Sequence, residues 1–307
     1  MRVIITGGTG FLGSALTAGL VAAGHEVIIL SRNPEKASGL PDGVPVVRWD
    51  AKTSYGWYTY ADGADAIINI AGASIAGENL FPTRWSSERR RLLYESRINA
   101  GHAIVAGLQQ VKTPPKVLIQ MSAVGYYGPS GSEELTEDAP ASGDFLSSIT
   151  QAWEDGTKPV EALGVRQVII RTGIVLDSDA QILKLMALPV RLFVGGPLGS
   201  GKQYISWIHR DDFVQAVLFL LEKADAAGAY NMTAPNPEMN QDFMKTIGEI
   251  LHRPTFFPTP AFAFRLAFGE LATTIVDGQR VLPARLQEAG YEFQYPELKP
   301  ALEDCLS

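Results

Sequence analysis

The sequence contains a single cysteine, Cys305. One cysteine cannot form a disulfide within the chain, and it leaves no basis for a cysteine-rich zinc cluster. No stretch approaches the roughly 18 consecutive apolar residues of a membrane span. Basic residues are outnumbered, with 26 lysines and arginines against 33 aspartates and glutamates and a net charge of −7. These absences predict a cytoplasmic protein with no metal, no membrane segment and no general nucleic-acid-binding surface.

Short apolar runs alternate with helical patterns along the chain, whose 307 residues are 46% hydrophobic. Each run is continuously apolar rather than alternating, as in strands buried on both faces of a parallel sheet. The longest helical patterns cover residues 88–109, 145–163 and 211–222. This order predicts an α/β protein with a doubly wound, parallel-sheet Rossmann fold. The expected strands are 3–6, 27–30, 44–47, 66–70, 117–121, 168–171 and, later, 229–233.

The composition and the pattern of the sequence change beyond about residue 175. A loop rich in glycine and proline covers 189–201, and residues 235–307 are punctuated by proline and mostly helical in pattern. We therefore predict two domains that the chain crosses more than once. Residues 1–175 plus about 206–233 form the nucleotide-binding domain, and about 176–205 plus 234–307 form a smaller, mostly helical substrate-binding domain.

The motif T-G-G-T-G-F-L-G occupies residues 6–13, between the first expected strand and the first helix. A pyrophosphate must approach backbone N–H groups at a helix N-terminus, so side chains have to be absent there. Gly7 permits the tight turn, Gly10 lets the backbone approach the phosphates, and Gly13 lets the helix pack on the strand. The turn predicts a nicotinamide dinucleotide held by Gly7, Thr9, Gly10, Phe11, Leu12 and Gly13.

The end of the second strand, L-S-R-N at residues 30–33, has no acidic residue. An NAD enzyme places a carboxylate here for the ribose 2′-hydroxyl, whereas an arginine accommodates a 2′-phosphate. Ser31 and Arg32 therefore favour NADP(H) over NAD(H), the alternative for Arg32 being a solvated loop residue. Asp50, after the third strand, is expected near the adenine, with a turn cap as its alternative.

The motif at 6–13 resembles that of the extended short-chain dehydrogenase/reductase superfamily, in its NAD(P)-dependent epimerase/dehydratase group. N-I-A-G at 69–72, S-A-V-G-Y-Y-G at 122–128 and W-I-H-R-D-D at 207–212 are similar to further motifs of that group. With G-G-P-L-G-S-G-K-Q at 195–203 and G-Q-R-V-L-P-A-R-L at 278–286, the chain most resembles the YfcH/SulA-like epimerase family proteins. The resemblance covers nearly the whole chain.

The resemblance implies a set of NADP(H) contacts and an assembly. A related family often dimerises through two long helices, equivalent here to 88–109 and 145–163, so a homodimer is one expectation. Arg97 lies on a helix that is already rich in arginine, most of which we interpret as a solvated face. The implied contacts are Gly10, Phe11, Leu12, Ser31, Arg32, Ile70, Ala71 and Arg97, with Gly72 completing the N-I-A-G segment.

The superfamily's catalytic residues are missing from the positions where the resemblance places them. Its chemistry uses a tyrosine as general acid/base, a lysine four residues later and a serine or threonine that positions the substrate oxygen. Counted back from Glu154, the lysine position holds Thr150 and the tyrosine position holds Leu146. The hydroxyl position holds Ala123.

Two neighbouring hydroxyl groups remain as weak catalytic candidates. Ser122 lies next to Ala123, where a slip of one residue would bring it into use, and an ordinary strand-end hydroxyl is its alternative. Tyr127 is one of the two nearest phenols, for which buried packing is the alternative. No lysine follows it at helical spacing.

Two other patterns suggest a phosphate-binding loop and a metal site, but each has a simpler interpretation. Residues 196–202 have the glycine and lysine spacing of a phosphate-binding loop, but Gln203 stands where magnesium needs a serine or threonine. Asp211 and Asp212 suggest a metal, yet acidic residues also favour the first turn of a helix. Lys202, Gln203, Arg171 and His209 are further candidates for the lining of a substrate cleft.

Two functions are consistent with these observations. The first is an NADP(H)-dependent oxidoreductase or epimerase that acts on an unidentified small molecule with a rearranged acid/base set. The second is a non-catalytic NADP(H)-binding sensor or regulator, linked by some relatives to cell division. The nearly complete cofactor motif favours the first, and the missing tyrosine and lysine favour the second.

Overall fold

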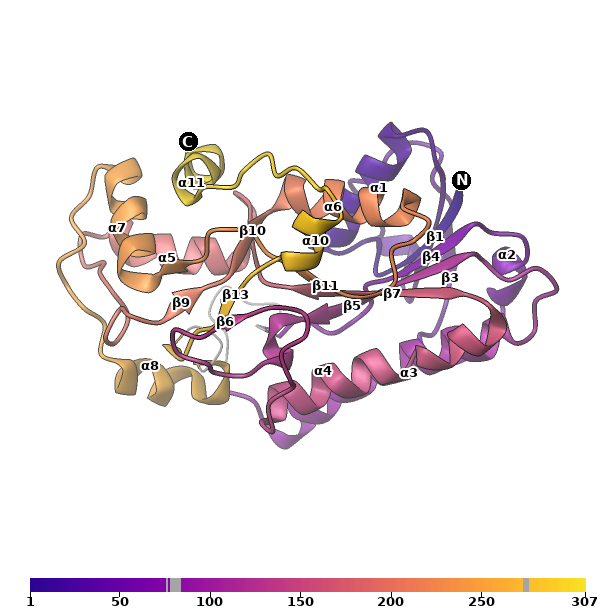
Figure 1. The fold of residues 1–307 in the computed structure, drawn as a ribbon, viewed down its shortest axis with the longest axis horizontal. Helices are drawn as coiled ribbons and strands as arrows, with labels where there is room; N and C mark the ends of the chain where they lie inside the picture. Colours follow the sequence, from indigo (N-terminus) through magenta and orange to yellow (C-terminus); the bar gives the residue numbers. More distant parts are fainter. Residues whose placement is uncertain (76, 78–83, 273–275) are drawn as a thin grey trace.

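The computed structural model describes residues 1–75, 77, 84–272 and 276–307 (Figure 1). Its centre is a seven-stranded sheet in the order β11-β7-β5-β4-β1-β2-β3, and every neighbouring pair is parallel. The strand order reverses at β1, as in a doubly wound fold. The strands are β1 (Arg2–Thr6), β2 (Glu26–Ser31), β3 (Val46–Arg48), β4 (Ala66–Asn69), β5 (Val117–Ala123), β7 (Arg166–Thr172) and β11 (Gly228–Met232).

Helices cover both faces of this sheet (Figure 1). Helices α1 (Phe11–Ala22) and α6 (Arg210–Glu222) lie on one face, and α3 (Ser87–Leu108) and α4 (Phe145–Asp155) lie on the other. Short helices are α2 (Tyr58–Ala61), η1 (Pro34–Lys36), η2 (Val124–Tyr126), η3 (Lys158–Leu163) and η4 (Gly269–Ala272).

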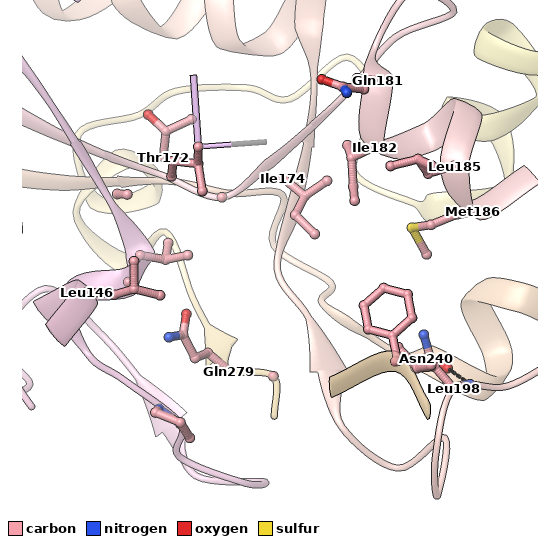
Figure 2. A pocket seen from close by; sticks show the side chains of 18 of the residues that line it. Leu146, Thr172, Ile174, Gln181, Ile182, Leu185, Met186, Leu198, Asn240 and Gln279 are labelled. Atoms are coloured by element: carbon pink, nitrogen blue, oxygen red, sulfur yellow. Dashed lines mark hydrogen bonds between the residues drawn. The ribbon is translucent and has the colours of Figure 1, made fainter. Parts of the chain in front are cut away.

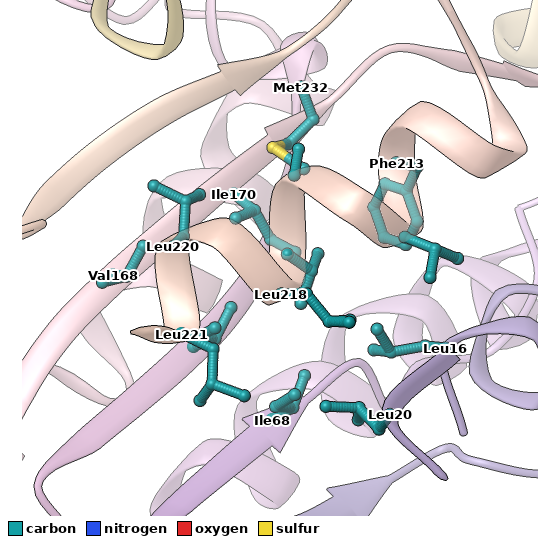
Figure 3. Close-up of a cluster of buried hydrophobic side chains, with 14 of the residues drawn as sticks. Leu16, Leu20, Ile68, Val168, Ile170, Phe213, Leu218, Leu220, Leu221 and Met232 are labelled. Atoms are coloured by element: carbon teal, nitrogen blue, oxygen red, sulfur yellow. The ribbon is translucent and has the colours of Figure 1, made fainter. Parts of the chain in front are cut away.

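Two hydrophobic cores explain the continuous apolar runs. Successive side chains of a strand point to opposite faces, so Ile5 enters the core beneath α1 and α6 while Ile4 enters the core beneath α3. Leu16 and Phe213 fill the first core (Figure 3), and Trp57 lies fully buried in the second. Both faces of the central strands are buried, which is why these strands lack a polar alternation.

A second unit lies beyond the carboxyl ends of the strands and has a core of its own, which includes Leu183, Trp207 and Phe243. Its helices are α5 (Gln181–Arg191), α7 (Asn240–Leu251), α8 (Ala261–Phe268) and α11 (Leu298–Leu306), whereas α10 (Ala284–Glu288) packs against β11 of the main sheet. Three pairs of short strands accompany them: β8 (Ile174–Leu176) with β10 (Trp207–His209), β9 (Tyr204–Ile205) with β12 (Glu238–Met239), and β6 (Glu134–Leu135) with β13 (Arg280–Val281).

The fold class predicted from the sequence is confirmed, while several element bounds were wrong. The helix expected over 145–163 ends at Asp155, and the 3₁₀ helix η3 follows. Gly156 caps α4, and Pro159 lacks the N–H that a continuing α-helix needs. The third strand begins at Val46 rather than at residue 44, because Pro45 contributes only its carbonyl to the ladder, accepting from Ile29 N at 2.9 Å.

The division into domains at the predicted residues stays a prediction, and the three residues 273–275 of the second domain lie outside the described part of the chain. Within that part, no helix is long and apolar enough to cross a membrane.

Candidate cofactor site and its adjoining cavity

The glycine turn between β1 and α1 has no room for side chains. Gly7 adopts a left-handed conformation, with φ of 74°, and a Cβ on it would lie 3.0 Å from Ile70 O. A Cβ on Gly13 would lie 2.1 Å from Gly7 O, inside the closest contact that real atoms make. The turn is closed by Gly10 N, which donates to Gly7 O at 3.0 Å. Gly7 therefore forms the tight turn that the sequence predicted, and Gly13 lies against the backbone of that turn.

The amino end of α1 is open to an anion. Gly10 is its N-cap, so no side chain caps the first backbone N–H groups, and the first turn holds no acidic residue. These groups have no partner within the helix and carry its positive dipole end. Thr9, Gly10 and Phe11 are exposed around them, and Leu12 is half-buried. This cradle fits the pyrophosphate of a dinucleotide.

The loop after β4 lies beside the turn. Asn69 is fully buried, accepts from Thr6 Oγ1 at 2.5 Å and donates to Gln120 Oε1 at 2.8 Å. Thr6 Oγ1 also accepts from Ala71 N at 3.3 Å. These bonds tie β4 to β1 and β5, so they hold Ile70, Ala71 and Gly72 next to the glycine turn.

Arg97 is a buried cation that reaches the same loop from α3. It donates to Leu93 O at 2.9 Å and to Ala73 O at 3.2 Å, and its guanidinium lies 4.7 Å from the ring centre of Trp153. Burial lowers the pKa of Arg97 to about 10. No carboxylate pairs with it among the residues that the structure describes, so a bound anion would supply the missing compensation.

The carboxyl end of β2 is basic. Arg32 is exposed and Ser31 is half-buried, with Ser31 Oγ accepting from Asn33 N at 3.2 Å. The nearby carboxylate of Glu35 is paired with Arg48 at 2.7 Å. Arg32 makes no side-chain ion pair or hydrogen bond within the described residues, so its guanidinium remains available to a ligand.

Asp50 caps its own turn. Its carboxylate accepts from Lys52 N at 2.8 Å and from Thr53 N and Thr53 Oγ1 at 2.8 and 2.9 Å. These bonds outweigh the effect of burial and lower the pKa of Asp50. The structure therefore favours the turn-cap alternative over the predicted adenine contact.

A cavity of about 960 Å³ opens at the carboxyl ends of β5 and β7 (Figure 2). It extends from Ala123 and Thr172, at these strand ends, to α5 in the second unit. Ligands of doubly wound folds bind at this edge of the sheet. Arg97 lines one side of the cavity, which connects it with the cofactor loop.

All three positions where the superfamily carries its catalytic groups line this cavity. They hold Ala123, Leu146 and Thr150, the residues that the sequence predicted for them. Thr150 Oγ1 donates back to Ser147 O at 2.8 Å, which is ordinary for a threonine within a helix. The cavity is therefore in the expected place, and the usual proton relay is missing from it.

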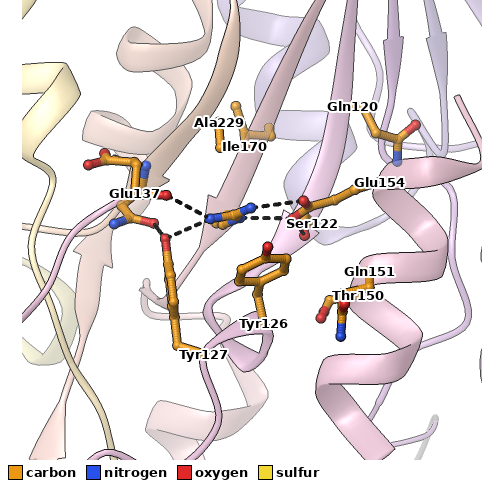
Figure 4. A network of polar contacts seen from close by, with 12 residues as sticks. Gln120, Ser122, Tyr126, Tyr127, Glu137, Thr150, Gln151, Glu154, Ile170 and Ala229 are labelled. Atoms are coloured by element: carbon orange, nitrogen blue, oxygen red, sulfur yellow. Dashed lines mark hydrogen bonds and ion pairs between the residues drawn. The ribbon is translucent and has the colours of Figure 1, made fainter. Parts of the chain in front are cut away.

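Ser122 and Tyr127 lie behind the cavity wall, in a buried polar network centred on Arg171 (Figure 4). Arg171 forms a two-pronged ion pair with Glu154, with its Nε at 2.9 Å from Oε1 and its Nη2 at 3.0 Å from Oε2. Ser122 donates to Glu154 at 2.6 Å, and Tyr127 OH accepts from Arg171 at 3.0 Å and donates to Asn231 at 2.7 Å. Both hydroxyl groups are thus committed to protein partners.

The network explains the pKa directions of its members. Burial raises the pKa of Tyr127 to about 12 despite the Arg171 charge beside it. Burial alone would lower the pKa of Arg171, but its hydrogen bonds and its charge interaction with Glu154 raise it above the ordinary value. Both groups keep their usual charge at neutral pH, which suits structural roles better than proton transfer.

The other residues proposed for a substrate cleft lie elsewhere, so that expectation was wrong. Gln203 is buried and donates to Leu198 O at 2.9 Å. His209 Nε2 contacts Asp304 Oδ2 at 3.2 Å and the ring stacks on Tyr295, so it fastens the C-terminal helix. Neither these residues nor Lys202 and Arg171 line the cavity.

His209, Asp304 and Cys305 also place three ligand-type atoms within 4.8 Å of one another. His209 Nδ1 already accepts from Asp211 N at 3.2 Å, so His209 Nε2 carries the proton toward Asp304. Burial raises the pKa of Cys305 to about 12. Metal ligands have to be deprotonated, and neither the protonated imidazole nitrogen nor the neutral thiol meets this requirement. We therefore interpret the three residues as a packing contact.

Sequence reasoning did not single out Gln279, which lies in the quoted G-Q-R-V-L-P-A-R-L segment. Its side chain lines the cavity from the segment next to β13, and its amide end faces Leu146 (Figure 2). The segment was noticed as a family pattern, but nothing in the sequence tells which of its side chains reaches the strand ends.

Comparisons with known proteins agree with this geometry. Residues 3–145 match the NAD dependent epimerase/dehydratase family, and residues 259–305 match a domain of unknown function, DUF1731. Epimerase family protein YfhF of Bacillus subtilis is 39% identical over 308 residues, covering 100% of this chain and 98% of that protein.

Solved structures show the same fold. The human epimerase family protein SDR39U1 (isoform 2), crystallised with NADPH, has a TM-score of 0.87 and 34% identity over 99% of both chains. UDP-glucose 4-epimerase from Thermus thermophilus, in complex with NAD, has a TM-score of 0.78 and covers 99% of this chain and 97% of its own, but at 19% identity it shares the fold alone. The glycine turn, the cavity at the strand ends and these matches together show that the chain belongs to the NAD-dependent epimerase/dehydratase family, as one of its epimerase family proteins.

Proposed function

We propose that this protein is an NADP(H)-dependent oxidoreductase or epimerase-like enzyme that acts on a small molecule in the cavity. The observation that carries the proposal is Arg97, a buried guanidinium without a carboxylate partner in the described residues, at the junction of cavity and cofactor loop. A bound dinucleotide would supply its counter-charge and would offer a hydride at the strand ends. The human relative crystallised with NADPH supports the same cofactor.

The preference for NADP(H) rests on Arg32. An unpaired guanidinium at the end of β2 can hold a 2′-phosphate with charge-assisted hydrogen bonds, each contributing about 1.5–3 kcal/mol. Arg32→Ala should therefore weaken NADPH binding about 10- to 100-fold in isothermal titration calorimetry and leave NADH binding nearly unchanged. Lys36→Ala, which removes an exposed cation four residues away at the end of η1, is the matched control. Equal loss for both dinucleotides would contradict the assignment.

The chain itself offers little acid/base chemistry to a bound substrate. Arg97 and Asp144 are the ionisable residues among those described as lining the cavity. Asp144 caps α4, accepting from Ser147 N at 2.9 Å and from Ser142 Oγ at 2.7 Å. A proton for the product would come from solvent, so the chain's contribution is to bind the substrate and to orient it toward the cofactor.

The activity is testable by following NADPH absorbance during incubation with aldehydes, ketones and sugar nucleotides. We expect turnover of at least one of these substrate classes. The rate should be nearly independent of pH between about 6 and 9, because no side chain has to titrate. Bound NADPH with no turnover across the whole set would contradict the enzymatic proposal.

The second candidate is a non-catalytic NADP(H)-binding regulator. It is supported by the replacement of all three catalytic positions by Ala123, Leu146 and Thr150. It requires that NADPH alter the surface seen by a partner. Hydrogen exchange with and without NADPH measures this, and a change confined to the glycine turn would weigh against a regulator.

A further inference from the structure

The cavity beside the cofactor site has an almost wholly apolar lining. One wall consists of Ile174, Ile182, Leu185 and Met186, from β8 and α5 (Figure 2). Leu146 stands on the sheet side, where the superfamily would place a phenol. Apolar walls favour a ligand that gains from leaving water, by about 25 cal/mol for each Å² of apolar surface. A sugar would lose its hydration there without recovering equivalent hydrogen bonds.

A nucleoside diphosphate sugar also needs cations for its diphosphate. Among the described lining residues, Arg97 is the single cation, and it lies next to the cofactor loop at Ala73. If Arg97 balances the dinucleotide, as the proposed function holds, the described lining offers no second positive side chain for another diphosphate. The charge distribution therefore points away from the substrates that the family name suggests.

Gln279 is one of the polar side chains in this lining, which also include Gln181 on α5 and Asn240 on α7 (Figure 2). Its backbone is fixed, because its N–H donates to Tyr204 O at 3.1 Å and its carbonyl accepts from Ser206 Oγ at 2.7 Å. Its side-chain amide makes no hydrogen bond with the part of the chain that the structure describes. The amide thus has two donors and an acceptor directed into an apolar space, opposite Leu146 (Figure 2).

The apolar character continues outward from the cavity. Leu192 and Val194 line it and are still 62% and 56% exposed. Gly195, which follows Val194, accepts from Phe257 N at 3.2 Å. Phe257 is itself 59% exposed, so it extends the apolar border. An exposed apolar border of this kind is uncommon on a monomer's surface and suits the passage of an apolar ligand.

We propose that the cavity binds a predominantly hydrophobic molecule with one carbonyl or hydroxyl oxygen, and that the Gln279 amide holds that oxygen. The substrate class is then an apolar ketone, aldehyde or alcohol rather than a sugar nucleotide. This proposal rests on the proposed function for its substrate role, but the binding that it describes does not require the cofactor.

The test uses the full chain and Nile red, whose fluorescence reports an apolar site. The competitors are 2-nonanone, 1-nonene as its match without oxygen, and UDP-glucose. We expect 2-nonanone to displace Nile red and UDP-glucose not to displace it. Gln279→Leu should weaken 2-nonanone about three- to tenfold, the usual contribution of one hydrogen bond, and leave 1-nonene unchanged.

Two further variants locate the bound probe. Ile182→Trp fills the cavity and should abolish Nile red binding, whereas Lys184→Trp places the same bulk on an exposed position of α5 and should preserve it. Circular dichroism and NADPH affinity establish that each variant is folded. Displacement by UDP-glucose, equal ketone affinity in Gln279→Leu and wild type, or Nile red binding by Ile182→Trp would overturn the proposal.

The same experiment separates the two proposals. A wild-type protein that binds NADPH but gives no ketone displacement contradicts the hydrophobic substrate and leaves the proposed function intact. A wild-type protein that binds 2-nonanone but no dinucleotide contradicts the proposed function and leaves the hydrophobic site intact.

Discussion

Single residues here show how a hydroxyl group near a strand end acquires its role from its partners. Ser122 was a catalytic candidate in the sequence because it adjoins Ala123, and Tyr127 because it is one of the nearest phenols. In the fold, Glu154 and Arg171 take up both hydroxyls. Sequence could place these residues near the site, but the hydrogen bonds depend on Arg171, which reaches them from β7.

Tyr127→Phe tests this assignment. The variant leaves Asn231 Oδ1 and one Arg171 N–H without their buried partner, so the free energy of unfolding should fall by about 1–3 kcal/mol. Urea unfolding measures the loss. Tyr126→Phe is the control, because its ring keeps its stacking 3.5 Å below the Arg171 guanidinium. An unchanged unfolding free energy with lost turnover would instead assign Tyr127 to catalysis.

The same variant should alter the dependence of stability on pH. Burial raises the pKa of Tyr127 from 10.0 to about 12, so the folded state favours the neutral phenol. Its contribution to stability is complete below pH 10 and is lost as the pH rises through 12. Urea midpoints at pH 9 and pH 11 should therefore converge for wild type and Tyr127→Phe as the pH rises. Parallel curves would refute this.

At the scale of elements, the turn between β1 and α1 is the part of the site that sequence predicted best. Its requirements are local, since Gly7, Gly10 and Gly13 interact within seven residues. The strands of the main sheet could be predicted equally well from the sequence, because strands with two buried faces are continuously apolar. Two-residue strands such as β9 and β13 were missed, because so short a run shows no periodicity.

Gly13→Ala should remove dinucleotide binding. The new methyl group would overlap Gly7 O, a backbone atom that cannot move without opening the turn. NADPH titration should show no measurable binding, and thermal unfolding should occur at a lower temperature. Gly143→Ala is the matched control, because a Cβ there meets nothing within 4 Å. Retained NADPH affinity in Gly13→Ala would contradict the proposed cradle.

At the scale of the whole molecule, the C-terminal segment is part of the nucleotide-binding core. Leu286, on α10, is fully buried in the cluster beneath α1 and α6. Arg285 binds Ala229 O and Asp138, joining the same segment to β11 and to the loop after β6. The sequence predicted two domains that the chain crosses more than once, and the contacts of Arg285 join the C-terminal segment to residues 56 and 147 positions earlier in the chain.

Leu286→Ala should therefore destabilise the whole molecule by about 2–5 kcal/mol, the usual cost of a buried leucine truncation. Far-UV circular dichroism and the fluorescence of the five tryptophans, which include Trp57 in one unit and Trp207 in the other, should show one coincident urea transition at a lower midpoint. Leu266→Ala, at a 70% exposed position, is the control. Two separated transitions would indicate independent units.

The substitution of both catalytic positions on one helix has a practical consequence. Leu146 and Thr150 lie one turn apart on α4 and open into a space that already meets the cofactor loop. Both positions therefore face the space in which the proposed function places the substrate. The double variant Leu146→Tyr, Thr150→Lys would place an ammonium one helical turn from a phenol. The ammonium should lower the pKa of the phenol, and phenolate absorbance near neutral pH would show that the acid/base pair has been restored.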